Sequence, residues 1–308
     1  MPEVSVLLPV RDGARTLALA MLSVLQQSFD DFELLVLDDG SADASPDIAL
    51  RFGDPRVRLL RDGMKRGLAA RLNQGIDAAA GRYIARMDAD DVCFPNRFAR
   101  QVERLNVERS LDLVACRVLD FDDTGSATGL RPFRLSHEAL CARPWNGFYL
   151  VHPSWMARAD WFRRYRYLVP ETMRTEDQEL LLRAYPHSRF AVLDEILLGY
   201  RVRPAALRKT LSARRNLLAA QITGFAQRRQ WRNLLLATLA TGLKLARDLL
   251  FATKAGRRWR NRCGCKISPE TMKAWAELLI TLSRRLDDLH LSHGFEIDGV
   301  LKAQAHAR

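Results

Sequence analysis

The 308-residue chain is predicted to have an α/β fold built on a Rossmann-like, mostly parallel sheet. Two observations predict this class. Short apolar runs alternate with helix-type segments through residues 1–110, with short connections between them. Two of these runs end in clusters of aspartate, and the carboxyl ends of parallel strands are where such sheets bind ligands. The hydrophobic content of 48% is typical of an ordinary globular protein.

The elements of the first half follow one another in a regular order. Strands are expected where short apolar runs end in charged residues or glycine, at 4–10, 32–41, 57–62 and 83–87. Helices are expected where apolar residues recur every three or four positions, at 16–27, from about 46, at 67–80 and from 95 to 109. Each connecting helix must cover one face of the sheet, so both faces are expected to be buried.

The regular alternation ends after a further strand expected at 111–121. The stretch 132–167 is rich in loops and aromatic residues, and it precedes a helix at 176–185 and a strand at 190–202. Nearly everything after Pro204 has helical spacing. The chain is therefore divided into three regions, at 1–110, 111–204 and 205–308.

The cysteines give no sign of a disulfide framework or a zinc site, because no CxxC pair and no histidine at ligand spacing accompanies them. They lie at positions 93, 116, 141, 263 and 265. No charged-then-apolar leader precedes the first expected strand. We therefore expect a cytoplasmic protein.

The net charge of +12 is unevenly distributed. Residues 201–266 hold 17 Lys and Arg against a single acid, Asp248, which gives this segment +16 and leaves the remainder at about −4. Polybasic segments attract phosphate-bearing partners, either nucleic acid or anionic lipid.

Closely spaced carboxylates follow the second and fourth expected strands. Asp38 and Asp39 end the second, and Asp88, Asp90 and Asp91 follow the fourth. Such carboxylates repel one another and raise one another's pKa unless a cation or hydrogen-bond donors compensate, so a divalent metal is a natural partner. The simpler interpretation is a solvated turn, since aspartate is common where a strand meets a loop.

The segment "DADDV" also satisfies the DxDx[TV] signature of haloacid-dehalogenase-like phosphatases, in which Asp88 would be the nucleophile. Those enzymes usually carry this motif on the first strand, whereas here it follows the fourth, and no GDxxxD motif comes after it. A phosphatase is therefore kept as an alternative.

Two longer segments carry a resemblance to a known family. "VSVLLPVRDGARTLALAMLSVLQQSFDDFELLVLDDGSAD" and "RGLAARLNQGIDAAAGRYIARMDADDVCFPNRFARQ" resemble, in order, the donor-binding segments of the non-processive family 2 glycosyltransferases, which have the GT-A fold. The resemblance spans about 1–203. It implies an inverting enzyme that moves a single sugar from a nucleotide-diphosphate sugar, UDP-linked by preference, to a glycan or lipid-linked acceptor in bacterial surface-polysaccharide assembly. No Q/RxxRW motif of processive enzymes follows, so polymer synthesis is not expected.

The resemblance also implies roles on the donor side. Asp39 would contact the base, and Pro9 would line the base pocket. Asp88 would bind the ribose, Asp90 would bind the Mn²⁺ or Mg²⁺ ion that bridges the two phosphates, and Arg71 would reach the nucleotide. Residues 1–110 would then form the nucleotide-sugar half and residues 111–204 the acceptor half.

The acceptor side is expected around "TEDQELLLR", residues 175–183. Thr175 and Gln178 have capping-box spacing, and Glu176 and Asp177 fall in the first helical turn, where acids favour the helix dipole. Helix formation alone explains this composition. The segment resembles the family's ED motif, which implies that Asp177 is the catalytic base and that Glu176 orients the acceptor or a loop.

The segment "LVHPSWMARADWF" resembles one that lines the acceptor side of the sugar pocket. By that resemblance His152 binds on the acceptor side, although a buried core histidine is the commoner fate of this residue type. Trp155, Trp145 and Tyr149 are candidates for faces on which a sugar stacks.

The basic C-terminal region has two interpretations. Its uncharged run, 233–243, is too short to span a bilayer. Residues 231–262 can instead lie on an anionic membrane surface as a basic amphipathic helix, or pack on the catalytic domain. The first interpretation places the protein on the cytoplasmic face of the inner membrane, and a non-catalytic membrane-associated scaffold is a further alternative. Nucleic acid is not expected, because no binding motif is recognised.

Overall fold

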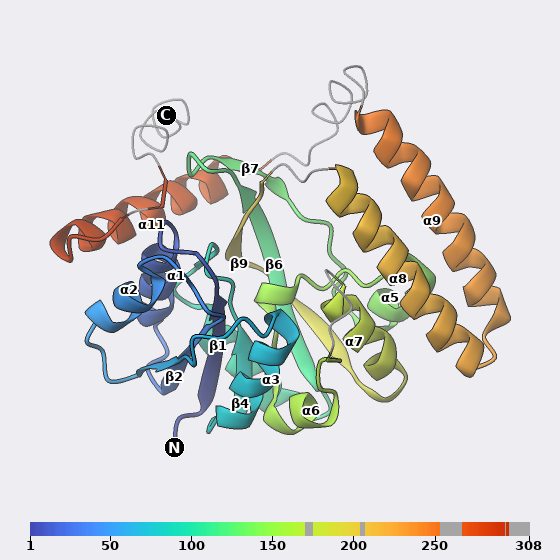
Figure 1. Ribbon diagram of the computed structural model, residues 1–308, viewed down its shortest axis with the longest axis horizontal. Coiled ribbons are helices and arrows are strands. Elements are labelled where there is room, and N and C mark those ends of the chain that lie inside the picture. The colour runs from blue at the N-terminus through green and yellow to red at the C-terminus, as the bar shows by residue number, and fades with distance from the viewer. Residues whose placement is uncertain (170–174, 204–206, 253–266, 293, 296–308) are drawn as a thin grey trace.

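A mostly parallel sheet forms the centre of the molecule (Figure 1). The computed structural model describes residues 1–169, 175–203, 207–252, 267–292 and 294–295. Within these residues the strand order is β3-β2-β1-β4-β8-β6-β9-β5, with β7 paired to β6. The strands are β1 (Val4–Val10), β2 (Phe32–Asp38), β3 (Val57–Leu60), β4 (Tyr83–Arg86), β5 (Val92–Cys93), β6 (Leu113–Phe121), β7 (Ala127–Leu130), β8 (Met156–Arg158) and β9 (Phe190–Arg201).

Strand β1 lies between β2 and β4 and is parallel to both. Leu7 is the register partner of Leu35 on β2 and of Arg86 on β4. All residues of these three strands are buried, which explains their continuous apolar runs. Because the strands are parallel and in register, the acidic segments that follow β2 and β4 emerge at the same edge of the sheet.

The order of the sheet changes beyond β4. The short strand β8 pairs antiparallel with both β4 and β6, and β9 then runs parallel to β6. Strand β5, which directly follows the acidic segment 88–91, pairs antiparallel with β9. The acidic segment is thereby fixed between the two halves of the sheet.

Helices cover both faces of the sheet, as predicted. Helices α1 (Leu17–Leu25) and α4 (Arg97–Val107) belong to the core on one face, and α2 (Ser45–Arg51) packs at its edge. The other face is covered by α3 (Leu68–Ala78), α6 (Ala159–Arg164) and α7 (Glu176–Ala184). A short helix, α5 (His137–Cys141), contacts β9.

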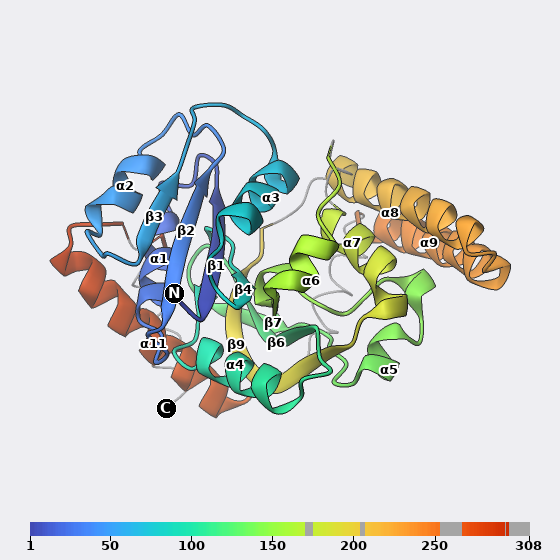
Figure 2. The same cartoon turned by 90° about the horizontal axis from the view of Figure 1, so that it is seen from below.

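The described C-terminal helices lie at opposite ends of the molecule (Figures 1 and 2). Helices α8 (Leu207–Gln227) and α9 (Trp231–Ala252) form an antiparallel pair next to α7. Helix α11 (Pro269–Asp288) packs on α1 instead. Its Trp275 is buried, packs against Phe121 with ring centroids 4.9 Å apart and the rings tilted by 48°, and donates a hydrogen bond to the Gly125 carbonyl.

Most predicted elements are confirmed, with ends that differ by a few residues. The second strand stops at Asp38, three residues early, because residues 39–41 turn away to form the loop at the sheet edge. Strand β8 and helix α6 were not predicted within 132–167. No helix in the described ranges is both long and apolar enough to cross a bilayer, as predicted for 233–243.

Candidate active site

Three cavities line up along the acidic edge of the sheet. The first, about 340 Å³, is lined by Pro9, Gly13, Asp88, Asp90 and Arg203 among others. The central cavity, about 410 Å³, is lined by Arg86, Asp88, Tyr149, His152, Glu176 and Asp177 among others. The outer cavity, about 750 Å³, lies against α8 and α9. Asp88 borders the first and central cavities, and Asp177 borders the central and outer ones, so the central cavity adjoins each of the other two.

The acidic segment after β4 presents two carboxylates to the first cavity. Asp88 accepts a hydrogen bond from the buried Arg86, with Nη2 to Oδ1 at 2.6 Å, and Asp90 lies 3.4 Å from Arg203. Burial, followed by repulsion from Asp88, raises the pKa of Asp90. Asp91 points inward and accepts a hydrogen bond from the Arg201 backbone N–H at 2.9 Å. Asp91 therefore anchors the segment to β9.

These two carboxylates fit a divalent cation that arrives with phosphate. Within the described residues, no group of three or more His, Cys, Asp or Glu side chains is arranged to hold a metal ion. Mg²⁺ is usually bound by one or two carboxylates and completes its coordination with substrate phosphates and water. Asp90 can supply such a ligand, and Asp88 opens onto the same cavity beside it.

Asp39, at the end of β2, is held by the loop before α3. Its Oδ1 accepts hydrogen bonds from the backbone N–H groups of Arg66 at 2.6 Å and Gly67 at 3.0 Å, and from Arg71 Nε at 3.2 Å. Arg71 is fully buried, and its other nitrogens bind Gln74 and Asp62. Arg71 therefore contacts protein rather than open space and fixes the Asp39 carboxylate.

Asp177 borders the central cavity from the first turn of α7. Burial raises the pKa of its carboxyl group, and hydrogen bonds from Gln178 partly offset this effect. A carboxylate with a raised pKa is a stronger base. Asp88 and Asp177 thus face one cavity from two different places in the fold, the segment after β4 and the first turn of α7.

The predicted capping box is wrong. The Thr175 side chain makes no cap hydrogen bond. The Gln178 side chain instead accepts a hydrogen bond from Phe148 N–H at 2.8 Å and donates one to the Phe148 carbonyl at 3.3 Å. A tertiary contact has replaced the local one, and it ties α7 to the loop that carries Tyr149.

His152 lines the central cavity although it is largely buried. Its Nε2 lies 2.7 Å from the Tyr167 hydroxyl, and its Nδ1 lies 4.0 Å from Glu176 Oε1. Burial, together with the charge of Arg86, lowers the pKa of His152 well below its usual value, so the ring is neutral near pH 7.

The aromatic candidates have different surroundings. Trp155 is fully buried and packs its ring edge-on against His152, with centroids 4.7 Å apart, so it supports that ring and does not line the cavities described above. Trp145 packs at the edge of the core. Tyr149 is 36% exposed and borders both the central and outer cavities, which leaves its ring accessible to a ligand.

Two residues that shape the central cavity, Arg86 and Tyr167, were not predicted from the sequence. Arg86 lines the cavity and holds Asp88, and Tyr167 holds His152. A signal for Arg86 was available, because an arginine inside a fully apolar strand indicates a buried ionic partner. Tyr167 carried no such signal, since its partner is 15 residues away.

The fold and these cavities define a GT-A type of nucleotide-sugar transferase. The sequence model described as Glycosyl transferase family 2 matches residues 5–166, more than half of the chain. The chain therefore belongs to family 2 of the glycosyltransferases. It is 34% identical over 190 residues to the putative glycosyltransferase EpsE of Bacillus subtilis, covering 60% of this chain and 67% of EpsE. It is 40% identical over 143 residues to the succinoglycan biosynthesis protein ExoO of Rhizobium meliloti, covering 46% of this chain but only 39% of ExoO.

Solved structures confirm the GT-A fold. S. aureus TarS, solved with UDP-GlcNAc, matches with a TM-score of 0.57 at 15% identity, covering 99% of this chain and 91% of TarS. The mannosyltransferase PcManGT from Pyrobaculum calidifontis, solved with GDP-Man and Mn²⁺, matches with a TM-score of 0.58 at 16% identity, covering 93% of this chain and 88% of that one. The phosphatase alternative is not favoured, because the family and the fold are those of glycosyltransferases.

The buried neutral state of His152 predicts a pH dependence of stability. Its pKa in the folded protein lies below the unfolded value of about 6.5, so below that pH protons bind preferentially to the unfolded chain. Each pH unit below about 6.5 should cost about 1.4 kcal/mol of unfolding free energy until the native pKa is reached. The His152→Gln variant lacks this contribution, so its free energy of unfolding should fall less steeply as the pH is lowered.

Urea unfolding from about pH 7.5 to 5.5 measures both slopes. The exposed His187→Gln is a matched control, and equal slopes for wild type and His152→Gln would contradict the prediction.

Proposed function

We propose that the protein transfers one sugar, with inversion, from a nucleotide-diphosphate sugar to a glycan or lipid-linked acceptor in surface-polysaccharide synthesis. The observation that carries this proposal is the placement of Asp88 and Asp177 on one cavity of about 410 Å³. One carboxylate comes from the edge where the sheet binds ligands, and the other, with its raised pKa, from α7. The name of ExoO, a succinoglycan biosynthesis protein, supports the assignment to polysaccharide synthesis.

The donor occupies the half formed by residues 1–110 in this proposal. Pro9 and Asp39 bind the base, Asp88 binds the ribose, and Asp90 holds Mn²⁺ or Mg²⁺. Arg71 acts by fixing Asp39. The metal, when bound, stabilises the negative charge that develops on the departing diphosphate. UDP-GlcNAc in TarS supports a UDP-sugar, and GDP-Man with Mn²⁺ in PcManGT supports a divalent ion.

The acceptor occupies the half formed by residues 111–204. Asp177 takes the proton of the attacking hydroxyl on the side of the sugar opposite the diphosphate, which gives a single displacement and therefore inversion. Glu176 and His152 orient the acceptor, and Trp155 supports the His152 ring. The exposed ring of Tyr149 offers the acceptor sugar a stacking face.

Two substitutions separate the donor role from the base role. Asp90→Asn should weaken Mn²⁺-dependent binding of a nucleotide-sugar, because the metal loses a charged ligand. Asp177→Asn should leave that binding nearly intact and lower kcat by at least about 10²-fold, the scale expected for losing a general base.

Thermal shift with UDP-, GDP- and dTDP-sugars in the presence of Mn²⁺ measures binding, because a ligand of the native state raises stability. Nucleotide release with acceptor measures turnover. Asp30→Asn, whose side chain is 91% exposed, is the matched control and should change neither. Equal losses of donor binding in Asp90→Asn and Asp177→Asn would contradict the division of roles, and the absence of a shift with every nucleotide-sugar would contradict the function.

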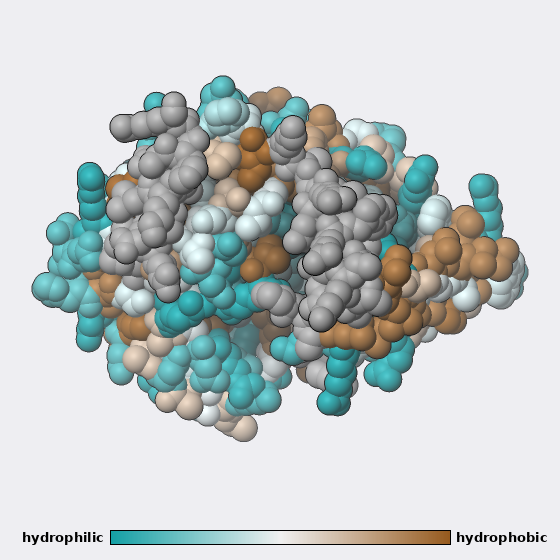
Figure 3. Space-filling model, turned by 90° about the horizontal axis from the view of Figure 1, so that it is seen from above, coloured by the Kyte–Doolittle hydropathy of each residue, from teal (hydrophilic) through white to brown (hydrophobic). Residues whose placement is uncertain are grey.

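We also propose that helix α9, in the C-terminal region that begins at residue 205, attaches the enzyme to an anionic membrane. Several large apolar side chains of this helix are more than half exposed. Those that recur at helical spacing are Trp231, Leu235, Leu239, Leu243 and Leu250. They form one strip, and Figure 3 shows the hydrophobic surface at that end of the molecule. The exposed Arg232 and Arg247 lie beside the strip. A membrane surface, with its apolar interior and anionic headgroups, therefore complements both the leucines and the arginines.

The basic residues 257–262 of the predicted segment lie outside the described residues. Peripheral attachment at the cytoplasmic face of the inner membrane follows from this proposal.

The strip predicts a specific loss of membrane binding. Wild type should sediment with phosphatidylglycerol vesicles, and a Leu235→Ser, Leu239→Ser, Leu243→Ser variant should not, because three side chains that insert have been removed. Turnover with a soluble acceptor should persist. Leu50→Ser, at a leucine on α2 that is 63% exposed, should sediment like wild type. Equal sedimentation of the triple variant and wild type, or a wild-type dimer that the triple substitution dissociates, would favour another role for the strip.

A further inference from the structure

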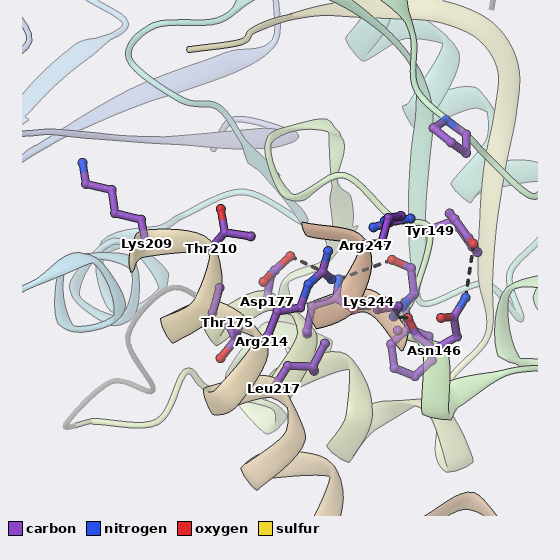
Figure 4. A pocket seen from close by; sticks show the side chains of 15 residues that line it. Asn146, Tyr149, Thr175, Asp177, Lys209, Thr210, Arg214, Leu217, Lys244 and Arg247 are labelled. Carbon is purple, nitrogen blue, oxygen red and sulfur yellow. Dashed lines mark hydrogen bonds between the residues drawn. The ribbon is translucent and has the colours of Figure 1, made fainter. Parts of the chain in front are cut away.

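The outer cavity is a basic compartment added to the active site by the C-terminal helices. Its described lining includes four cationic side chains, Lys209 and Arg214 from α8 and Lys244 and Arg247 from α9. All four lie beyond residue 166, where the match to the family ends. Figure 4 shows Arg214, Lys244 and Arg247 gathered with Asp177 around the same space, and Lys209 farther along α8.

The positive charge of this cavity is only partly balanced. Asp248 accepts a hydrogen bond from Arg214 at 3.1 Å and lies 3.6 Å from Arg247. Lys244 donates a hydrogen bond to the Asn146 carbonyl at 2.7 Å, and among the described residues no carboxylate lies within ion-pair distance of it. Asp248 thus lies beside two of the four cations, Lys244 binds a neutral carbonyl, and the described lining itself contains one carboxylate, Asp177.

The titration of Lys244 is in keeping with this excess. Burial, followed by repulsion from Arg214 and Arg247, lowers its pKa to about 8. Asp248 opposes the shift but does not cancel it. A bound anion would restore the charged state of the lysine, since an opposite charge favours ionisation.

The cavity is positioned to hold one end of a ligand whose other end reacts. Asp177, Gln178 and Tyr149 border both it and the central cavity. A ligand that fills both places a hydroxyl near the Asp177 carboxylate and its far end among the cations. Lys244 borders the cavity, while the exposed leucines of α9 point to solvent, so this end of the ligand lies beside the apolar strip.

We propose that the outer cavity binds the phosphate or diphosphate group of the acceptor. This inference rests on the proposed function, because it takes Asp177 as the base that meets the acceptor hydroxyl. Guanidinium groups bind phosphate oxygens through paired hydrogen bonds, and lysine adds a compact charge. A diphosphate carries several negative charges, which suits a set of four cations better than the single charge of a carboxylate does. The phosphate belongs either to a lipid-linked saccharide or to a soluble phosphorylated one.

Calorimetric titration of the full chain with inorganic pyrophosphate tests the site, in EDTA so that no metal directs the probe to Asp90. Lys244→Gln with Arg247→Gln should weaken binding by at least about tenfold, because two charged hydrogen-bond donors are lost. Lys244→Arg, which keeps the charge, should retain most of the affinity. The matched control is Arg215→Gln with Arg229→Gln, which removes equal charge from exposed positions outside the cavity lining. Wild-type melting behaviour of each variant shows that it is folded, and the exposed Lys209→Gln offers a second substitution in the cavity.

The result expected is tight pyrophosphate binding that the cavity variants weaken and the matched control does not. Farnesyl diphosphate bound more tightly than inorganic pyrophosphate, which has the same number of phosphate groups, would indicate a lipid-linked source. Glucose 1-phosphate bound at least as tightly as farnesyl diphosphate would indicate a soluble one, and either result supports the phosphate site. Absence of binding to all three probes, or equal weakening in the matched control, would overturn the proposal. Nucleotide-sugar binding with Mn²⁺, measured on the same samples, shows separately whether the donor site works.

Discussion

The active site depends on pairing the carboxylates at the strand ends with buried arginines. Arg71 fixes Asp39 after β2, and Arg86 fixes Asp88 after β4. A buried carboxylate without such a partner would be costly and would take up a proton. These pairs hold the two carboxylates in fixed positions before any ligand binds. The Asp90 side chain lies 3.4 Å from the partly exposed Arg203, borders the first cavity, and is proposed to meet a cation that brings phosphate.

The described C-terminal helices join the catalytic domain at opposite ends of the molecule. Helix α11 joins the core beside α1, at the end of the molecule opposite α8 and α9 (Figure 1). Helices α8 and α9 instead wall the outer cavity and expose an apolar strip. This pair of helices thus adjoins Asp177, the proposed base, on one face and presents on the other the apolar strip that is proposed to bind a membrane. A lipid-linked acceptor has a sugar, a phosphate and a lipid. In the proposal these three parts match the central cavity, the outer cavity and the apolar strip, in that order.

The sequence predicted the first half of the fold well because buried parallel strands are continuous apolar runs, and β1 was predicted to the residue. It missed β8, which has three residues and is defined by its two partner strands rather than by its own pattern. It placed the acidic residues at the sheet edge, but it assigned Arg71 to the nucleotide rather than to Asp39 and did not include Arg86. The capping box at Thr175 failed because Gln178 has a tertiary partner, which local spacing cannot reveal.

The most direct test of a single displacement at the central cavity is the anomer of the first product. In the absence of acceptor, slow hydrolysis of an α-linked nucleotide-sugar transfers the sugar to water, and time-resolved proton NMR identifies the anomer released before mutarotation. With Asp177 acting opposite the diphosphate, the β-anomer should appear first. Initial release of the α-anomer would contradict the account, because retention requires a second displacement or attack from the diphosphate side.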